Sequence, residues 1–216
     1  MSLNVAFKLA QDAGHEIPEI VIYEKQSTYL GMWNYTWQTG LDRHGEPIPN
    51  SMYDHLYTNT CKETCEYPYY TFQDHWNLPA TPSYPPRTAM RSYIEGHFRK
   101  LGGKIEWIKF NTVVKMVSFD KETQLFTVIT RNYSQKQEYT DYFDYVICAT
   151  GHFSYPSIDP LACFKNYTGT IIHSHDQRTF SNYKNKTVLV IGTKFSAEDI
   201  AAISYKFGAK KVICCH

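Results

Sequence analysis

Three residues near the end of the chain, Gly192, Lys194 and Ala197, have the spacing of a Gly-x-Gly-x-x-Gly loop. They follow an apolar run, Val188–Ile191, whose pattern predicts a buried parallel strand, and they lead into residues 196–205, which have helical spacing. A strand, a tight glycine turn and a helix N-terminus can hold a dinucleotide pyrophosphate, because free backbone N–H groups and the helix dipole both favour negative charge. The first candidate is therefore a dinucleotide site.

Lys194 departs from the loop pattern, because the second glycine normally lets the backbone approach the pyrophosphate closely. A side chain obstructs that approach, although an ammonium group could partly compensate by direct charge contact. Ala197 is a common variant of the third glycine. Residues 211–216, about twenty positions after Gly192, contain no carboxylate, and this favours NADP over NAD because an acid there would repel a 2′-phosphate. The loop alone leaves dinucleotide binding open.

Glu24 is the second candidate, because it ends a segment, 19–24, that is predicted to be a buried strand. An acid at this place in a Rossmann unit accepts hydrogen bonds from ribose hydroxyls, whereas the alternative is a solvated carboxylate at a strand end. A helix is predicted before it at residues 2–13, with Gly14 as its C-cap. The glycine turn that should precede this helix is expected before Met1, in a longer protein.

Metal ligands and thiols give weaker signals. Cys61 and Cys65 could recruit a metal, but their spacing is poor and no second Cys/His pair completes four ligands. His173 and His175 are interpreted as structural, and no metal site is expected. The six cysteines are too scattered for a disulfide scaffold, and the first residues lack signal-peptide features, so we interpret the thiols as reduced and the protein as cytoplasmic.

The composition argues against several classes of partner. The 22 basic and 21 acidic residues nearly balance, which disfavours nucleic acid or an anionic membrane as the main partner. No apolar run approaches the roughly 20 residues that cross a bilayer. Many of the 18 tyrosines lie between positions 53 and 84, where ligand lining and loop packing are both open interpretations.

The elements that must position these residues follow from apolar spacing and turn residues. Helices are predicted at 2–13, 88–101 and 196–205, and strands at 19–24, 105–108, 112–119, 126–132, 137–142, 143–149, 188–191 and 211–215. Segment 25–87 has no sustained period and is too long for a structureless loop, so we expect it to wrap a ligand or a neighbouring element. The order predicts an α/β fold with two incomplete Rossmann-like dinucleotide-binding units and a β-meander.

Short motifs along the whole chain carry a further signal. They include Glu24–Gln26, Gly31–Trp37, Tyr57–Asn59, Ser83–Arg87, Thr150–Ser154 and Ser196–Ile200. A pattern F-x-G-x-x-x-H with an aromatic four residues later has its counterpart in Tyr167, Gly169 and His173. Together these motifs resemble the flavin-containing monooxygenases, especially the trimethylamine monooxygenase-like branch, over essentially all 216 residues.

The resemblance implies an FAD- and NADPH-dependent monooxygenase. In that family NADPH reduces FAD, O₂ adds at flavin C4a, and the hydroperoxide oxygenates the nitrogen or sulfur of a small amine or sulfide. The alternative is a catalytically inactive remnant of the fold with at most weak nucleotide binding. Another flavoprotein with two dinucleotide sites, such as a reductase, would normally have a Cys-x-x-Cys pair, and this sequence has none.

The resemblance also implies the roles of individual residues. Those implied to bind FAD are Glu24, Gln26, Gly31, Met32, Trp33 and Val114, with Asn59 beside the isoalloxazine and nicotinamide and Tyr57 next to it. Those implied to hold NADP(H) are Gly192, Thr193, Lys194, Ser196 and Ala197, and Thr150 and Gly151 form the crossing between the two nucleotide domains. No residue is implied to bind metal.

From this pattern we expect a partial FAD-binding domain at 1–151, a linker at 152–186 and the start of an NADP-binding domain at 187–216. Substrate and O₂ are the expected partners, and a homodimer is left open. Leu30 stands where the family has the first glycine of Gly-Gly-x-Trp, and Gln177 replaces the last aromatic of the identifying pattern. These departures favour the inactive remnant, and the phosphate loop expected before Met1 predicts a fragment of a longer protein.

Overall fold

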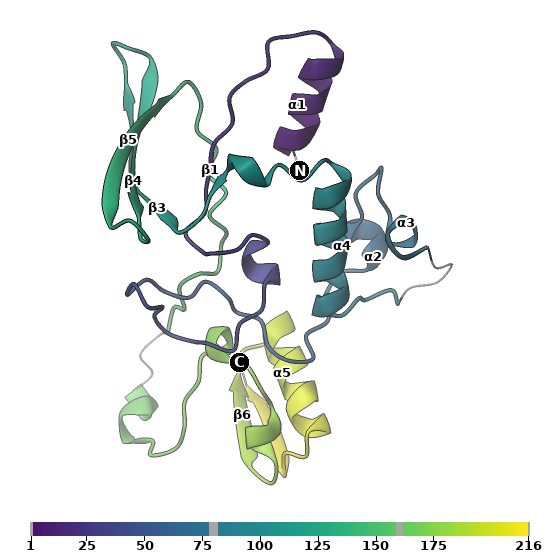
Figure 1. Ribbon diagram of the computed structural model, residues 1–216. Coiled ribbons are helices and arrows are strands. Elements are labelled where there is room, and N and C mark those ends of the chain that lie inside the picture. Colours follow the sequence, from purple (N-terminus) through teal and green to yellow (C-terminus); the bar gives the residue numbers. More distant parts are fainter. Residues whose placement is uncertain (1, 78–81, 159–161, 216) are drawn as a thin grey trace. The chain divides into compact units, whose positions relative to one another are not determined.

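The computed structural model describes residues 2–77, 82–158 and 162–215 (Figure 1). Its internal contacts group the chain into two compact units. Unit 1 consists of Met1–Gly31 and Ser92–Thr150, and unit 2 of Met32–Arg91 and Gly151–His216. Both units combine helices with a two-stranded parallel sheet, which is the α/β organisation predicted from the sequence.

Unit 1 begins with helix α1 (Ser2–Asp12), which ends as predicted just before Gly14. Gly14 has a φ of +69°, a left-handed conformation that glycine adopts without steric cost. Strand β1 (Ile22–Tyr23) pairs in parallel with β2 (Ile108–Lys109). Both strands are shorter than predicted, because the parallel ladder contains only two residue pairs and Ile105–Trp107 forms a 3₁₀ helix instead.

Three of the four strands predicted for the β-meander form it in unit 1, whereas the predicted first strand, at 105–108, does not, because β2 pairs in parallel with β1. Strands β3 (Thr112–Asp120), β4 (Leu125–Asn132) and β5 (Gln137–Phe143) form one antiparallel sheet in that order. The Asp120 carboxylate closes the first turn by accepting the Glu122 N–H at 2.8 Å, as acidic residues at turns commonly do.

The strand predicted at 143–149 is wrong, because only Phe143 lies in a strand, as the last residue of β5. A strand needs a neighbour for its N–H and C=O groups, and no strand in the described ranges pairs with residues 144–149. An apolar run is therefore not sufficient to form a strand. Tyr145 is 87% exposed and Ile147 66% exposed, which is unlike a buried strand.

Helix α4 (Arg87–Lys100) matches the predicted helix to within one residue at each end. Segment 25–87 contains the 3₁₀ helix η1 (Gly31–Trp33) and two short helices, α2 (Lys62–Cys65) and α3 (Phe72–Trp76). Helix α3 starts with a capping box, since Thr71 Oγ1 accepts the Asp74 N–H at 3.0 Å and the Asp74 carboxylate accepts the Thr71 N–H at 2.9 Å.

The side chains of segment 25–87 show how it is held without regular structure. Ile48, Met52, Tyr53, Tyr70 and Phe72 are buried. Packing therefore accounts for some of the clustered aromatic residues. Tyr57, Tyr69 and Tyr84 are exposed instead, so loop packing does not explain the whole cluster.

Unit 2 contains the predicted strand–turn–helix, but its first strand is not buried as predicted, since Leu189 is 56% and Ile191 51% exposed. Strand β6 (Thr187–Ile191) pairs in parallel with β7 (Lys211–Cys215) over five residue pairs, and α5 (Phe195–Lys206) connects them. Parallel strands need such a crossover, usually a helix, so this is a βαβ unit. Ile200 and Ile203 of α5 form a buried cluster with Tyr53 and Phe180, which come from distant parts of the sequence.

The expected linker contributes to this core. It contains three short 3₁₀ helices, η3 (Ala162–Asn166), η4 (Ser174–Asp176) and η5 (Ser181–Tyr183), and Phe180 is almost completely buried. Within the residues that the structure describes, no helix combines the length and apolar character needed to span a membrane.

Candidate functional site

The turn after β6 has the geometry that the glycine pattern predicts. Gly192 has a φ of +127°, which residues with a side chain rarely adopt, and its N–H donates to the Cys215 carbonyl at 2.8 Å. A Cβ built on Gly192 would lie 3.7 Å from the Cβ of Ala197. Small residues at both positions therefore let the start of α5 come close to the end of β6.

The N-terminus of α5 presents unsatisfied donors. The Lys194 carbonyl accepts the N–H groups of Ala197 at 2.8 Å and Glu198 at 3.2 Å, whereas the N–H groups of Phe195 and Ser196 donate to no acceptor in the described part of the chain. Free N–H groups at the positive end of a helix of this length attract an anion such as a phosphate. Thr193, Lys194 and Ser196 are all exposed at this turn.

Glu24 in unit 1 is held against the start of the meander. Its backbone N–H donates to the Lys109 carbonyl at 3.1 Å, and its carbonyl accepts the Thr112 N–H at 3.0 Å. Its carboxylate accepts the Gln26 N–H at 2.8 Å. Burial raises the pKa of this carboxyl above its usual range, and the Gln26 N–H and the charge of Lys25 partly oppose that rise.

The structure therefore brings three predicted FAD residues into one neighbourhood of unit 1. Gln26 is fixed there because its carbonyl accepts the Asn111 N–H at 3.0 Å. Val114 follows in the same strand as Thr112, and its side chain is partly exposed.

The segment around Gly31 has an unusual backbone. Leu30 has a φ of +81° and Gly31 a φ of +51°, so a leucine occupies a left-handed conformation that favours glycine. Met32 and Trp33 complete the 3₁₀ helix that starts at Gly31. The Met32 carbonyl accepts a hydrogen bond from Asn50 Nδ2 at 2.7 Å. The Met32 sulfur lies 3.8 Å from Ser51 Oγ.

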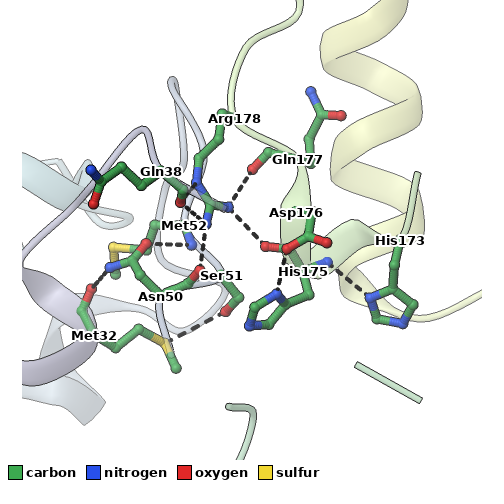
Figure 2. A network of polar contacts seen from close by, with 10 residues as sticks. All are labelled: Met32, Gln38, Asn50, Ser51, Met52, His173, His175, Asp176, Gln177 and Arg178. Carbon is green, nitrogen blue, oxygen red and sulfur yellow. Dashed lines mark hydrogen bonds and ion pairs between the residues drawn. The ribbon is translucent and has the colours of Figure 1, made fainter. Parts of the chain in front are cut away.

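A buried arginine, which the sequence analysis did not single out, lies at the centre of a polar network in unit 2 (Figure 2). The Arg178 guanidinium donates to the Gln38 carbonyl through Nε at 3.2 Å and Nη2 at 2.9 Å, and through Nη2 to the Asn50 carbonyl at 2.6 Å. Its Nη1 donates to the carbonyls of His175 at 2.8 Å and Gln177 at 2.9 Å. Burial lowers the pKa of the guanidinium, and the charge of Asp176 opposes this.

Tyr57 and Asn59 are both exposed in unit 2. Tyr57 lines a cavity of about 250 Å³ together with Asp54, His55, Leu56, Pro86, Arg87 and Thr88. One wall of this cavity is an ion pair, with Arg87 Nη2 3.3 Å from the Asp54 carboxylate. Asn59 does not line the cavity. Thr150 and Gly151 are exposed, and the boundary between the two units falls between them.

A larger cavity, of about 320 Å³, lies in unit 1 and is lined by none of the predicted site residues. Its lining residues are Tyr23, Lys109, Phe110, Thr112, Thr130, Asn132, Gln135, Tyr139 and Asp141. The Tyr23 hydroxyl donates to the Asp141 carboxylate at 2.5 Å across it. Its polar groups largely bond one another, so its size alone does not make it a site.

His173 of the identifying pattern and the nearby His175 make local contacts. His173 Nδ1 accepts the His175 N–H at 3.0 Å, and His175 Nδ1 lies 2.8 Å from the Asp176 carboxylate. His175 Nε2 is buried and has no hydrogen-bond partner within the described ranges. Among the residues with described positions, no group of three or more His, Cys, Asp or Glu side chains could hold a metal ion.

The contact between Tyr53 and Asp199 also escaped the sequence analysis. The Tyr53 hydroxyl donates to the Asp199 carboxylate of α5, and burial together with this bond raises the pKa of the phenol. The two residues are 146 positions apart, and neither the spacing nor the composition of the sequence indicates that they meet.

Comparisons with known proteins show which family the chain resembles in sequence and fold. A family model described as FMO-like, flavin-binding monooxygenase-like, matches residues 11–216. The trimethylamine monooxygenase of Roseovarius nubinhibens is 46% identical over 211 residues, which are 98% of this chain and 47% of that protein. The crystal structure of Tmm from Pelagibacter sp. strain HTCC7211 matches with a TM-score of 0.90 at 39% identity, covering 99% of this chain and 48% of that chain.

A more distant solved structure is also similar to this chain. The structure of S-allyl-L-cysteine S-oxygenase from Allium sativum matches with a TM-score of 0.79 at 25% identity, covering 98% of this chain and 48% of that chain. The chain thus spans about half the length of the relatives it matches. Because the family model covers nearly the whole chain, from residue 11 to the end, this protein belongs to the flavin-binding monooxygenase-like family.

Proposed function

We propose that this chain carries the FAD site and the start of the NADP(H) site of a flavin-dependent monooxygenase, which oxygenates the nitrogen or sulfur of a small amine or sulfide. The observation that carries the proposal is the turn after β6, where Gly192 and the free N–H groups of α5 form an anion site in a chain of this family. The names of the relatives, a trimethylamine monooxygenase and an S-oxygenase, support the substrate class.

The residues after β6 fit the pyrophosphate of NADP(H). Gly192 and Ala197 leave room for the backbone to approach it, and the N–H groups of Phe195 and Ser196 supply donors. Thr193 and the backbone at Lys194 would add contacts to the phosphates, whereas the exposed Lys194 side chain takes space that the second glycine of the pattern leaves free. Strand β7 offers no carboxylate to repel a 2′-phosphate, which supports NADP(H) over NAD(H).

The residues at the end of β1 fit the adenosine end of FAD. The Glu24 backbone is fixed on both sides and its carboxylate by the Gln26 N–H, and this carboxylate would accept hydrogen bonds from the ribose hydroxyls. Gln26 and the backbone at Val114 would flank the nucleotide, and Gly31, Met32 and Trp33 would contact it beyond the ribose. Bound FAD would supply the redox and oxygen chemistry, and the protein would bind it, orient it and exclude water.

Further parts of the proposal concern residues without a direct geometric argument. Asn59 would lie beside the isoalloxazine and the nicotinamide, with Tyr57 next to it, and Thr150 and Gly151 would form the crossing between the nucleotide domains. Residues 1–151 would then be a partial FAD-binding domain, 152–186 a linker and 187–216 the start of the NADP-binding domain. A homodimer and a cytoplasmic location complete the proposal; the free thiols of Cys61, Cys65, Cys148, Cys214 and Cys215 support a reducing compartment.

One observation favours the second candidate, an inactive remnant with weak nucleotide binding. The strained backbone at Leu30 lies next to the segment proposed to meet the FAD phosphates, and a leucine side chain there takes space that a glycine would leave free.

The absorbance spectrum of the purified chain decides between the two. A yellow protein with flavin bands, or a colourless one that keeps flavin bands after titration with FAD and removal of unbound FAD, supports the proposed function. In the same titration Glu24→Ala should bind FAD at least tenfold more weakly, whereas Glu16→Ala, an exposed carboxylate in the same unit, should bind it like the wild type. A chain that takes up no added FAD would favour the remnant.

A further inference from the structure

The Arg178 network differs from an ordinary buried ion pair, because every hydrogen bond of the guanidinium goes to a backbone carbonyl. The side chain is only 8% exposed, and its acceptors belong to Gln38, Asn50, His175 and Gln177. A buried cation without adequate partners is costly, so this arrangement persists only because five donor contacts compensate for lost hydration. Arg178 thus bonds residues near position 38 and position 50 to its own segment.

Asn50 continues the network toward Met32. This side chain is 3% exposed, and its Nδ2 donates to the carbonyls of Met32 at 2.7 Å and Asn34 at 3.2 Å. Its Oδ1 accepts the Met52 N–H at 3.0 Å. Because the Asn50 carbonyl in turn accepts from Arg178, a continuous chain of hydrogen bonds leads from Arg178 to Met32 (Figure 2).

The segment from Met32 to Asp54 needs this support because it has little secondary structure. One isolated bridge, Leu41–Pro47, is the only strand-like pairing described within it. Buried carbonyl groups must be satisfied, and in a segment with few backbone hydrogen bonds side chains take over part of this task. A planar guanidinium with five donors can serve several carbonyls at once, which a lysine ammonium group cannot do in this geometry.

We propose that Arg178 and Asn50 are positioning residues, which hold the backbone of Met32–Asn34 in one conformation before any ligand binds. The consequence for FAD rests on the proposed function, in which Met32 and Trp33 contact the flavin nucleotide. Such preorganisation removes the ordering cost from the binding step, so loss of the network should weaken FAD binding without removing a direct contact.

The first experiment needs no cofactor. Hydrogen–deuterium exchange of the ligand-free chain should be at least tenfold faster in residues 32–38 of Asn50→Asp, whose carboxylate cannot donate to the two carbonyls, and of Arg178→Lys. Exchange in β3–β5 of unit 1 should stay unchanged, which separates a local release from global unfolding. Arg99→Lys is the matched control, because Arg99 forms an exposed ion pair with Glu95.

The second experiment tests the positioning role itself. FAD titrations followed by flavin fluorescence should give a dissociation constant at least tenfold higher for both variants, while NADP⁺ binding changes less than twofold for Asn50→Asp. Unchanged exchange in residues 32–38 overturns the inference. Faster exchange with unchanged FAD affinity overturns the link to the cofactor.

The two experiments also separate the inference from the proposed function. If the wild-type chain binds no FAD, the proposed function fails, and the exchange data alone decide whether the network orders the segment. If Asn50→Asp does not fold, Arg178→Lys keeps the charge and some of the donors, and the same two measurements apply to it.

Discussion

Residues 29–33 and residues 191–196 both place a large side chain where the nucleotide-binding pattern has glycine, but the backbone treats the two replacements differently. Leu30 has a φ of +81°, in the left-handed region, whereas Lys194 has a φ of −94° and a ψ of 177°, which any residue adopts. Leu30 therefore strains the chain, and Lys194 does not. A large side chain in place of glycine therefore lowers stability at position 30, whereas at position 194 it affects the approach of a ligand and does not strain the backbone.

The second segment also contains a glycine that the backbone requires. Gly192 has a φ of +127°, so it would be strained by any side chain, even though a Cβ would find ordinary contact distances. The backbone conformation therefore requires glycine at position 192, favours glycine over leucine at position 30, and accepts any residue at position 194. Substitutions can test each position.

Gly192→Ala should have the largest effect. The added Cβ forces an unfavourable backbone conformation, which costs about 1–3 kcal/mol of unfolding free energy. Urea denaturation of the purified chain measures this, with Ser196→Ala on the exposed face of the same turn as the control. A loss of unfolding free energy below about 0.5 kcal/mol would show that the turn relaxes around the added Cβ, so that position 192 does not require glycine.

Leu30→Gly should stabilise the chain by about 1 kcal/mol, because relief of the left-handed strain exceeds the entropy that glycine adds to the unfolded state. Leu30→Ala is the informative control, since it keeps the Cβ and should give no gain. Thermal unfolding of the three proteins side by side measures the difference. Equal stability of the Gly and Ala variants would contradict the assignment of strain.

Lys194→Ser should stabilise the chain by about 0.5–1 kcal/mol and tighten NADPH binding. Lys194 is the N-cap of α5 without a side-chain capping bond, and serine can accept an N–H of the first turn. Lys194→Ala separates the two effects, because it removes the obstruction without adding a cap. Weaker NADPH binding by both variants in a fluorescence titration would mean that the ammonium group contacts the phosphates.

Glu24→Gln should have the smallest effect on stability, and this effect should depend on pH. Burial raises the pKa of the Glu24 carboxyl, so the folded state holds its proton more tightly than the unfolded state does. The wild type therefore loses stability as the pH rises from the ordinary pKa of a glutamate through the raised one.

The glutamine variant lacks this dependence, so it should melt at a higher temperature than the wild type at pH 7 and nearly match it at pH 4. It should also bind FAD more weakly, because an amide offers a weaker acceptor to the ribose than a carboxylate does. Glu16→Gln, an exposed position, should melt like the wild type at both pH values. A Glu24→Gln variant that is less stable than the wild type at pH 7 would show that the carboxylate is well solvated.

Much of the fold was predictable because it depends on local patterns. Helices α1, α4 and α5, strands β3–β5 and strands β6 and β7 follow from apolar spacing and from glycines at helix ends. The strand predicted at 143–149 failed because an apolar run forms a strand only when another strand lies beside it. The candidate nucleotide turn at Gly192 was predictable for the same reason as the helices, since its residues are neighbours in the sequence.

By itself, the sequence determined the kind of protein: an α/β chain with a glycine turn before a helix, a carboxylate at the end of an earlier strand and the motifs of one family. Only the tertiary structure decided that Leu30 is strained and Lys194 is not, and that Arg178 is buried and bonded to Gln38, 140 residues away. Local patterns encode helices and turns because their bonds join near neighbours. The satisfaction of buried carbonyl groups in an irregular segment depends on which distant side chain reaches them, and no spacing in the sequence records that.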